Sequence, residues 1–298
     1  MLPALLREEA LKNQLSKTSV LVRIFCFSIS AKINLMRKYW TIFQLSWQNN
    51  FEYRFEFFSH MLLGLVEMMV LIFVWQAVFK QVGNFSGYNF GSMITYLVMV
   101  QFLHFVNRQN TSRQIAEQIK EGDLSVFLLK PFDYLQYWFF SFLASRFFEF
   151  LVRLSIIFVF LVIFLPSLPF LDFGRLLVFI LFLMISLLFN FLLNCIFASS
   201  AFWVTDIRLF STVVDLTIGF FSGALMPLDI FPGFLKTVSQ ILPFQYLLFF
   251  PIKIFQGSLP NKQILLGAVM AISWTIGLLF LLKFLWQKGL RKYEAIGQ

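Results

Sequence analysis

Residues 176–203 read LLVFILFLMISLLFNFLLNCIFASSAFW, a run without a single charged side chain. A helix rises about 1.5 Å per residue, so a run of this length is long enough to cross the roughly 30 Å hydrocarbon core of a bilayer. The whole chain has the same character: hydrophobic residues make up 59% of its 298 residues, charged residues only 13%, and 43 residues are Phe. A soluble domain with so few charges would lack polar cover. The composition therefore predicts an all-α integral membrane protein.

Further apolar runs lie on both sides of this one, and together they predict six transmembrane helices within a domain that covers residues 57–298. The predicted spans are residues 57–79, 90–106, 141–165, 176–203, 210–226 and 264–286. Residues 226–260 contain too many prolines for a span and are too apolar for a free loop. We therefore expect a re-entrant or amphipathic outer element before the last span, since irregular backbone at membrane depth must be sheltered by protein. A plain loop with interfacial aromatics is the alternative.

Lys and Arg gather before the first predicted span, in the loop after the second, and beyond the last. Positively charged loops stay in the cytoplasm, so we expect a multi-pass protein of the cell membrane with both termini cytoplasmic. The net charge of +9 fits this topology and contact with anionic membrane lipid. No basic block with interleaved aromatics occurs, so nucleic acid is not an expected partner.

The N-terminal region divides into two parts. Residues 36–56 mix Trp and Phe with Arg, Lys and Gln, which predicts a helix lying in the membrane interface; a helix packed on the bundle is the alternative. Residues 1–35 form an extension without a span or a clear cleavage site. We expect translation to begin at Met36 rather than at Met1.

No catalytic constellation is present in the sequence. There is no G-x-x-x-x-G-K-[ST] phosphate-binding loop and no G-x-S-x-G elbow. His60 and His104 have no carboxylate at metal-ligand spacing, and Cys26 and Cys195 have no cysteine partner at such a spacing. We therefore expect a protein that is not an enzyme and that needs no metal or cofactor.

Charged residues within predicted spans are candidate functional groups, because charge is costly in hydrocarbon. Glu67 has two possible roles, as a substrate-path or gating carboxylate or, the favoured one, as a structural hydrogen-bond partner. Arg146, Glu149 and Arg153 lie three and four residues apart, so they share a helix face and can pair. A structural ion network is favoured over a transport site for these three. Asp215 is a lone acid in the fifth predicted span, and its partner is not evident.

Two spacing patterns point to helix contacts. Gly219 and Gly223 form a G-x-x-x-G match, which allows close helix approach and fits a dimer interface, although such matches are common by chance. Asn190 and Asn194 lie one helical turn apart and can cross-link neighbouring helices by hydrogen bonds.

The main exception to the apolar composition is residues 119–131, IKEGDLSVFLLKP, between the second and third predicted spans. Its charged residues surround Gly122, which predicts a turn between two short helices, because glycine tolerates positive φ. This segment is either a solvated loop or a docking surface for a soluble partner.

The order of parts resembles the permease subunit of an ABC type-2 exporter, in the branch whose permeases work with a separate ATPase. The resemblance runs from Met36 to the C-terminus and is carried by IAEQIKEGDLSVFLLKPFDYL, MPLDIFPGFL and ILPFQYLLFFPIKIFQG. It implies a dimer with a second permease copy or a paralogous permease, and an ATPase subunit docked on residues 115–129. The implied docking residues are Glu117, Lys120, Glu121, Gly122 and Asp123. Two alternatives remain: an ion-coupled secondary transporter that uses acids such as Glu67 and Asp215, and a non-transporting membrane scaffold or resistance protein.

Overall fold

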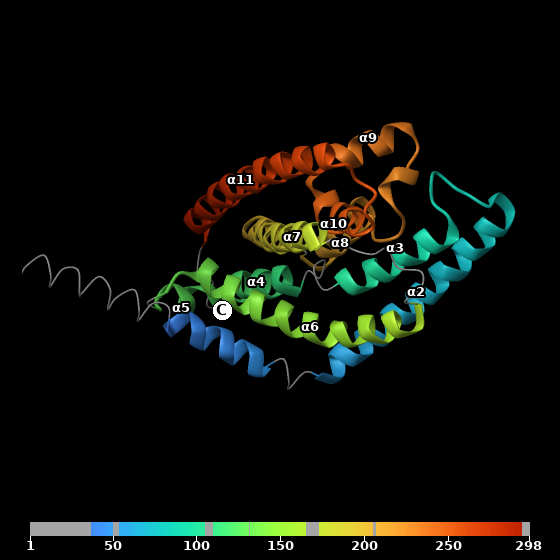
Figure 1. Ribbon diagram of the computed structural model, residues 1–298. Coiled ribbons are helices and arrows are strands. Elements are labelled where there is room, and N and C mark those ends of the chain that lie inside the picture. The colour runs from blue at the N-terminus through green and yellow to red at the C-terminus, as the bar shows by residue number, and fades with distance from the viewer. Residues whose placement is uncertain are drawn as a thin grey trace, which may run out of the picture.

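The computed structural model describes residues 37–49, 54–104, 110–130, 132–164, 173–204 and 207–293. Residues 1–36, which include the N-terminal extension and the expected start at Met36, lie outside the described residues. A helix over residues 37–49 is followed by the helices α2 (Arg54–Val82), α3 (Phe90–Leu103), α4 (Asn110–Glu121), α5 (Leu124–Leu128), α6 (Tyr134–Phe164), α7 (Phe173–Ser199), α8 (Ile207–Ser222), α9 (Gly233–Ile241), α10 (Phe249–Phe255) and α11 (Asn261–Lys292). No β-strand occurs in the ranges described (Figure 1).

Each of the six predicted spans overlaps a helix, namely α2, α3, α6, α7, α8 and α11. Within the described part, three segments are long and apolar enough to cross a membrane: Leu62–Val82, Phe173–Phe202 and Asn261–Lys292. The 14-residue α3 covers only about 21 Å at 1.5 Å per residue, less than a hydrocarbon core. The all-α membrane class is therefore confirmed, whereas the number of six crossings stays a prediction.

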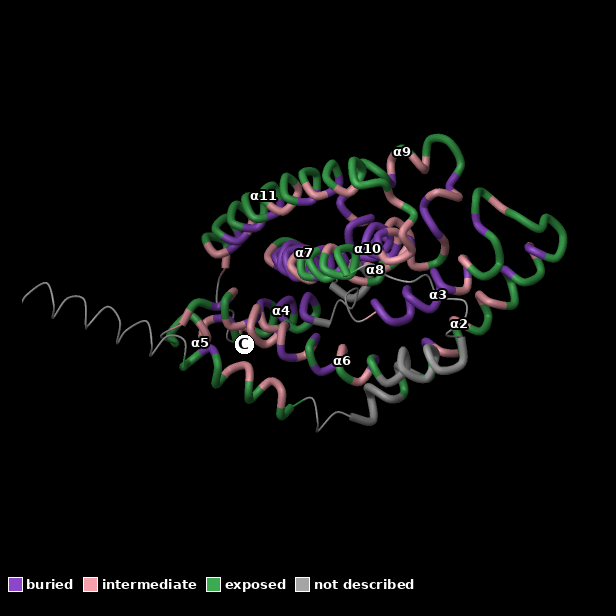
Figure 2. The backbone as a smooth tube through the Cα atoms, in the orientation of Figure 1, coloured by how far each residue is buried: buried purple, intermediate pink, exposed green. Residues whose placement is uncertain are grey.

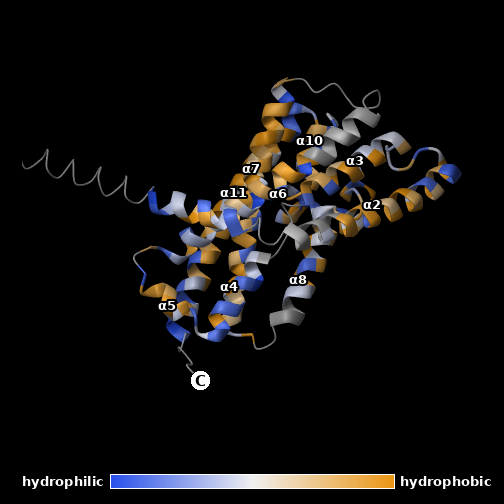
Figure 3. Ribbon diagram, turned by 90° about the horizontal axis from the view of Figure 1, so that it is seen from below, coloured by the Kyte–Doolittle hydropathy of each residue, from blue (hydrophilic) through white to orange (hydrophobic). Residues whose placement is uncertain are grey.

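The core is built around α7, which packs against α11, α4 and α10. In Figure 1, α7 lies between α11 on one side and α4 and α6 on the other. Its buried residues cluster in its second half, from Phe189 to Ser199. Figure 2 shows purple, the colour of buried residues, on α7 in the middle of the molecule. The long helices are rich in apolar residues, which Figure 3 shows as orange along α2 and α7. Several of these residues are exposed, such as Leu63 on α2 and Leu177 on α7. This distribution fits helices whose outer surfaces contact lipid rather than water.

Residues 226–260 fold into short helices. These are the 3-10 turn η4 (Leu228–Ile230), α9, the 3-10 turn η5 (Pro243–Tyr246) and α10. Most of α10 is buried against α7, including Phe249, Ile252 and Ile254, whereas Phe234 on α9 is exposed. The segment is thus a helical cap, called here the α9 cap, and its depth in a membrane stays a prediction.

The helix over residues 37–49 packs on α6. The Tyr39 hydroxyl donates a hydrogen bond to the Gln136 side-chain oxygen, and the Tyr39 ring stacks on Phe140 with ring centroids 4.8 Å apart. Ser46 Oγ donates to Ser141 Oγ at 3.0 Å. One face of this helix is therefore held by protein, while Trp40 on another face is exposed. Residues 50–53 of the predicted interfacial helix 36–56 lie outside the described residues, and residues 54–56 belong to α2.

Candidate functional site

The polar segment between the second and third predicted spans folds as two short helices joined at Gly122. Helix α4 ends at Glu121, α5 begins at Leu124, and Gly122 has a φ of 87°. This positive φ agrees with the turn that the sequence predicts. The hydroxyl of Ser125 donates to the Gly122 carbonyl at 2.7 Å, which ties the start of α5 to the turn. Residues 115–129 are called the α4–α5 turn from here on.

The α4–α5 turn has an apolar inner side and a polar outer side. Ile115, Ala116, Ile119 and Leu124 are buried in the core of the bundle. The implied docking residues point the other way: four of them have exposed side chains, namely Glu117, Lys120, Glu121 and Asp123. The buried side holds the turn on the bundle, so the charged side chains are available to a binding partner.

The first turn of α4 is anchored on α7 by asparagine. The Ser112 backbone N–H donates to Asn194 Oδ1 at 2.9 Å, and Asn194 Nδ2 donates to Asn190 Oδ1 at 2.8 Å. Ser112, Asn190 and Asn194 are buried. Asn194 thereby satisfies one of the N–H groups that the first turn of a helix leaves without an intrahelical acceptor. The cross-link between helices predicted from the asparagine spacing is present between α7 and α4.

The C-terminal end of α11 closes over the same turn. The hydroxyl of Tyr293 donates to the Gly122 carbonyl at 2.9 Å. Trp286 stacks on Tyr134 with ring centroids 5.3 Å apart, and Tyr134 donates to Gln118 Oε1 at 2.8 Å. These contacts attach α11 to both α4 and the turn. The segments involved lie far apart in the sequence, and no pattern in the sequence predicts them.

The charged trio on α6 has a structural arrangement. Arg146 Nη1 lies 3.1 Å from Glu149 Oε1, and both side chains are buried. Arg153 Nη1 donates to the backbone carbonyl of Gln101 at 2.7 Å, which connects α6 to α3. The structure therefore pairs Arg146 with Glu149, and it directs Arg153 to a neighbouring helix.

The two lone acids have different surroundings. Glu67 lies on the exposed surface of α2. Asp215 on α8 is half-buried, and its Oδ1 atom has no hydrogen-bond partner within the part of the chain that the structure describes. Arg113 on α4 interacts electrostatically with the Asp215 carboxylate. Asp215 is therefore close to the first turns of α4, a relation that the sequence does not predict.

The G-x-x-x-G glycines also differ from one another. Gly219 lies in α8 with open space where a side chain would be. Gly223 lies one residue beyond α8, is buried, and its carbonyl accepts a hydrogen bond from the Tyr96 hydroxyl at 2.6 Å. Gly223 is thus engaged within the chain, and a dimer contact at these glycines stays a prediction.

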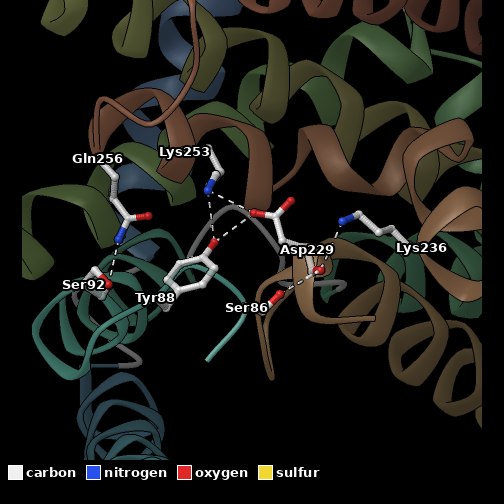
Figure 4. Close-up of polar contacts among 7 residues, drawn as sticks. All are labelled: Ser86, Tyr88, Ser92, Asp229, Lys236, Lys253 and Gln256. Carbon is white, nitrogen blue, oxygen red and sulfur yellow. Dashed lines mark hydrogen bonds and ion pairs between the residues drawn. The ribbon is translucent and has the colours of Figure 1, made fainter. Parts of the chain in front are cut away.

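A second polar cluster joins the α9 cap to the loop between α2 and α3 (Figure 4). Lys253 Nζ on α10 lies 3.0 Å from Asp229 Oδ2 and 3.2 Å from the hydroxyl of Tyr88. The Tyr88 hydroxyl donates to Asp229 Oδ2 at 3.1 Å. Burial, together with the nearby Asp229 carboxylate, raises the pKa of Tyr88 above its ordinary value. The Tyr88 hydroxyl is therefore protonated at neutral pH and can donate its hydrogen bond to the Asp229 carboxylate. We call these three residues the Asp229 cluster.

The family model for ABC-2 family transporter proteins matches residues 65–297. The chain belongs to the ABC-2 transporter family. It is an integral membrane protein of the permease type, as the resemblance seen in the sequence predicts. A search of curated proteins gave no match.

The Asp229 cluster gives a structural reason for two sequence segments of this ABC-2 transporter. Asp229 belongs to MPLDIFPGFL, and Lys253 belongs to the second part of ILPFQYLLFFPIKIFQG. Both segments identify the family in the sequence, but neither charged residue is a predicted site. The sequence could have indicated this ion pair. Each motif has a single charged residue among apolar ones, and a charged residue in such a segment needs a partner.

The described part of this ABC-2 transporter provides an exposed polar surface and hydrogen-bonded connections between helices. Among the described residues, no group of three or more His, Cys, Asp or Glu side chains could hold a metal ion. The outer side of the α4–α5 turn is exposed, and the turn accepts a hydrogen bond from Tyr293, directly after α11. The first turn of α4, which precedes it, is hydrogen-bonded to α7.

Proposed function

We propose that this ABC-2 family member is the membrane-spanning permease subunit of an ATP-driven exporter in the cell membrane. A separate ATPase subunit binds the α4–α5 turn, and a second permease copy or a paralogous permease completes the membrane part. The observation that carries this proposal is the turn itself, with buried Ile115, Ile119 and Leu124 behind exposed Glu117, Lys120, Glu121 and Asp123. The chain has no phosphate-binding loop, so the energy of ATP comes from a partner.

In the proposed orientation the α4–α5 turn and both termini face the cytoplasm, and the α9 cap faces outward. The excess of Lys and Arg before α2 and after α11 supports this orientation. Nucleotide binding shifts the permease only if the ATPase binds one of its conformations more tightly than the other. The bonds from Asn194 to Ser112 and from Tyr293 to Gly122 would carry that preference into α7 and α11.

Charge reversal at the turn tests this function. The double variant Glu121→Lys/Asp123→Lys should lower recovery of the ATPase subunit with the purified permease about tenfold, because both carboxylates are exposed and face the expected partner. Recovery is measured by affinity purification from the native host, with mass spectrometry to identify a chain that carries a phosphate-binding loop. Membrane insertion should be unchanged.

The matched control is Lys262→Glu, which reverses an exposed charge at the first turn of α11. This variant should recover as much ATPase as the natural chain. Equal recovery with the double variant would contradict docking through these charges. Absence of any such ATPase from the natural complex would instead favour an ion-coupled transporter or a scaffold.

A further inference from the structure

The α4–α5 turn carries an apolar surface as well as charges. Val126 is 56% exposed, Leu128 is 50% exposed and Leu129 is 88% exposed. Within the described ranges, no other large hydrophobic residue is as exposed as Leu129. We call these three residues the Leu129 patch. Contiguous exposed apolar groups of this kind commonly mark sites of protein interaction.

Lipid is a poor explanation for the Leu129 patch. Exposed charged residues flank it in the sequence on both sides, namely Lys120, Glu121, Asp123, Lys130 and Asp133. A patch immersed in hydrocarbon would bring these charges into the membrane, where each is costly. The patch therefore faces water in the isolated chain, and a protein surface is its expected cover.

The direction of the patch is fixed by contacts on the opposite side of α5. Leu124 is buried, and the Phe127 ring packs against Tyr134 and Tyr137, with centroids 5.6 and 5.3 Å away. Lys130 Nζ lies over the same Phe127 ring at 3.9 Å from its centroid. These inward contacts leave Val126, Leu128 and Leu129 on the outside.

The patch is also held in place before any partner binds. The Gly122 carbonyl accepts hydrogen bonds from Tyr293 and Ser125, at 2.9 and 2.7 Å, on the N-terminal side of α5. A surface that is already ordered loses little conformational entropy on binding, so more of its contact energy appears as affinity. A preorganised, protruding leucine with apolar neighbours has the character of an interface anchor.

We propose that Leu129, supported by Val126 and Leu128, is the main anchor through which the turn binds the ATPase subunit. The inference rests on the function proposed above, and it assigns the binding energy to apolar contact rather than to the charges. Exposed charges of both signs lie at the turn: the acids Glu117, Glu121, Asp123 and Asp133, the bases Arg113, Lys120 and Lys130, and also Arg291 and Lys292 before Tyr293. The matching ATPase surface is therefore an apolar hollow with a charged rim, and the rim orients the partner.

Affinity measurements with the full-length permease test the anchor. The ATPase subunit identified by mass spectrometry is titrated onto immobilised, detergent-solubilised permease. Leu129→Ser should weaken binding about 30-fold, the effect typical of an anchor residue. Leu129→Met, which keeps an apolar side chain of similar volume, should stay within about threefold of the natural chain. The salt dependence of binding should be the same for Leu129→Ser as for the natural chain, whereas Glu121→Lys/Asp123→Lys should change it.

The matched control is Phe234→Ser on α9, because Phe234 is 80% exposed but lies in the α9 cap rather than in the turn. It should bind the ATPase like the natural chain. If Leu129→Ser does not yield folded protein, Leu128→Ser replaces it, with an expected loss of about fivefold.

The possible results distinguish a failure of the Leu129 anchor from a failure of the proposed ATPase-binding function. If the natural chain binds no ATPase subunit, the proposed function itself fails. If the natural chain binds the ATPase and Leu129→Ser binds it equally well, the anchor is wrong and the docking function stands. If Leu129→Ser changes only the oligomeric state of the permease, or if removal of residues 294–298 exposes the patch further, then another part of the permease covers the patch and the anchor is again wrong.

Discussion

Gly122 has a left-handed backbone, with φ of 87°, at the point where α4 passes into α5. A β-carbon in this conformation costs about 1–2 kcal/mol, because it approaches the following carbonyl oxygen. Gly122→Ala should therefore lower the free energy of unfolding by about 1–2 kcal/mol and lower the thermal midpoint of the detergent-purified protein. It should also weaken ATPase binding, because the turn presents α5.

Gly277→Ala is the control for this substitution. Gly277 lies inside α11, and nothing lies within 4 Å of the added β-carbon. Alanine is favoured over glycine in a helix, so the thermal midpoint should be equal to or above that of the natural chain. A Gly122→Ala variant as stable as Gly277→Ala would show that the turn relaxes without strain.

Single residues could be predicted from sequence where the cause is local. The turn at Gly122 follows from glycine between charged residues, and the pairing of Arg146 with Glu149 follows from their three-residue spacing. The hydrogen bond from Tyr293 to Gly122 joins residues 171 positions apart, and the sequence around neither residue predicts it. The exposure of Leu129 could not be predicted either, because an apolar residue at the end of a short helix is expected to be buried unless the positions of its neighbours are known.

At the scale of elements, hydropathy predicted where helices occur more accurately than it predicted the residues at which they begin and end. Helix α6 begins at Tyr134 although its predicted span begins at residue 141, and α2 begins at Arg54 although its span begins at residue 57. The hydrocarbon-crossing part of a helix must be apolar, but its backbone hydrogen bonds continue into water without that restriction. For the α9 cap, the sequence predicted a re-entrant or amphipathic element but not the bounds of its short helices, because the prolines interrupt the helical pattern of apolar residues.

The Asp229 cluster holds the α9 cap to the loop between α2 and α3. The Lys253 side chain is only 13% exposed and lies 3.0 Å from the Asp229 carboxylate. Asp229→Asn leaves this ammonium group without its anionic partner, so we expect a loss of about 1–3 kcal/mol in stability. Thermal unfolding and protease cleavage within residues 226–260 measure the effect.

The exchanged pair Asp229→Lys/Lys253→Asp should recover part of the lost stability, because residues in contact are energetically coupled. Lys262→Gln, which removes an exposed charge beside the cap, should change neither the unfolding midpoint nor the cleavage pattern. If Asp229→Asn behaves like Lys262→Gln, the cluster does not stabilise the cap.

At the scale of the whole molecule, α2 and α11 both expose apolar side chains, and of these two helix faces only the α2 face includes an acid. The α11 face includes Leu265 and Phe280, and α11 contains no acidic residue, so this face suits lipid. The α2 face includes Leu63 and Val70 beside exposed Glu67. Packing of α2 within the chain is concentrated on α3, through a small cluster that includes Trp75 and Phe79.

This difference predicts which face meets the second permease. A charged side chain near the middle of a bilayer costs about 3 kcal/mol or more, so the face with Glu67 is the one that protein or a polar path should cover. A photo-crosslinking amino acid at Val70, three residues from Glu67 on the same face, should therefore link to a second permease chain. The same group at Phe280 should link to lipid. The mass of the Val70 product distinguishes an identical copy from a paralogue. A permease link at Phe280 and none at Val70 would place the interface on α11 and leave Glu67 facing lipid or water.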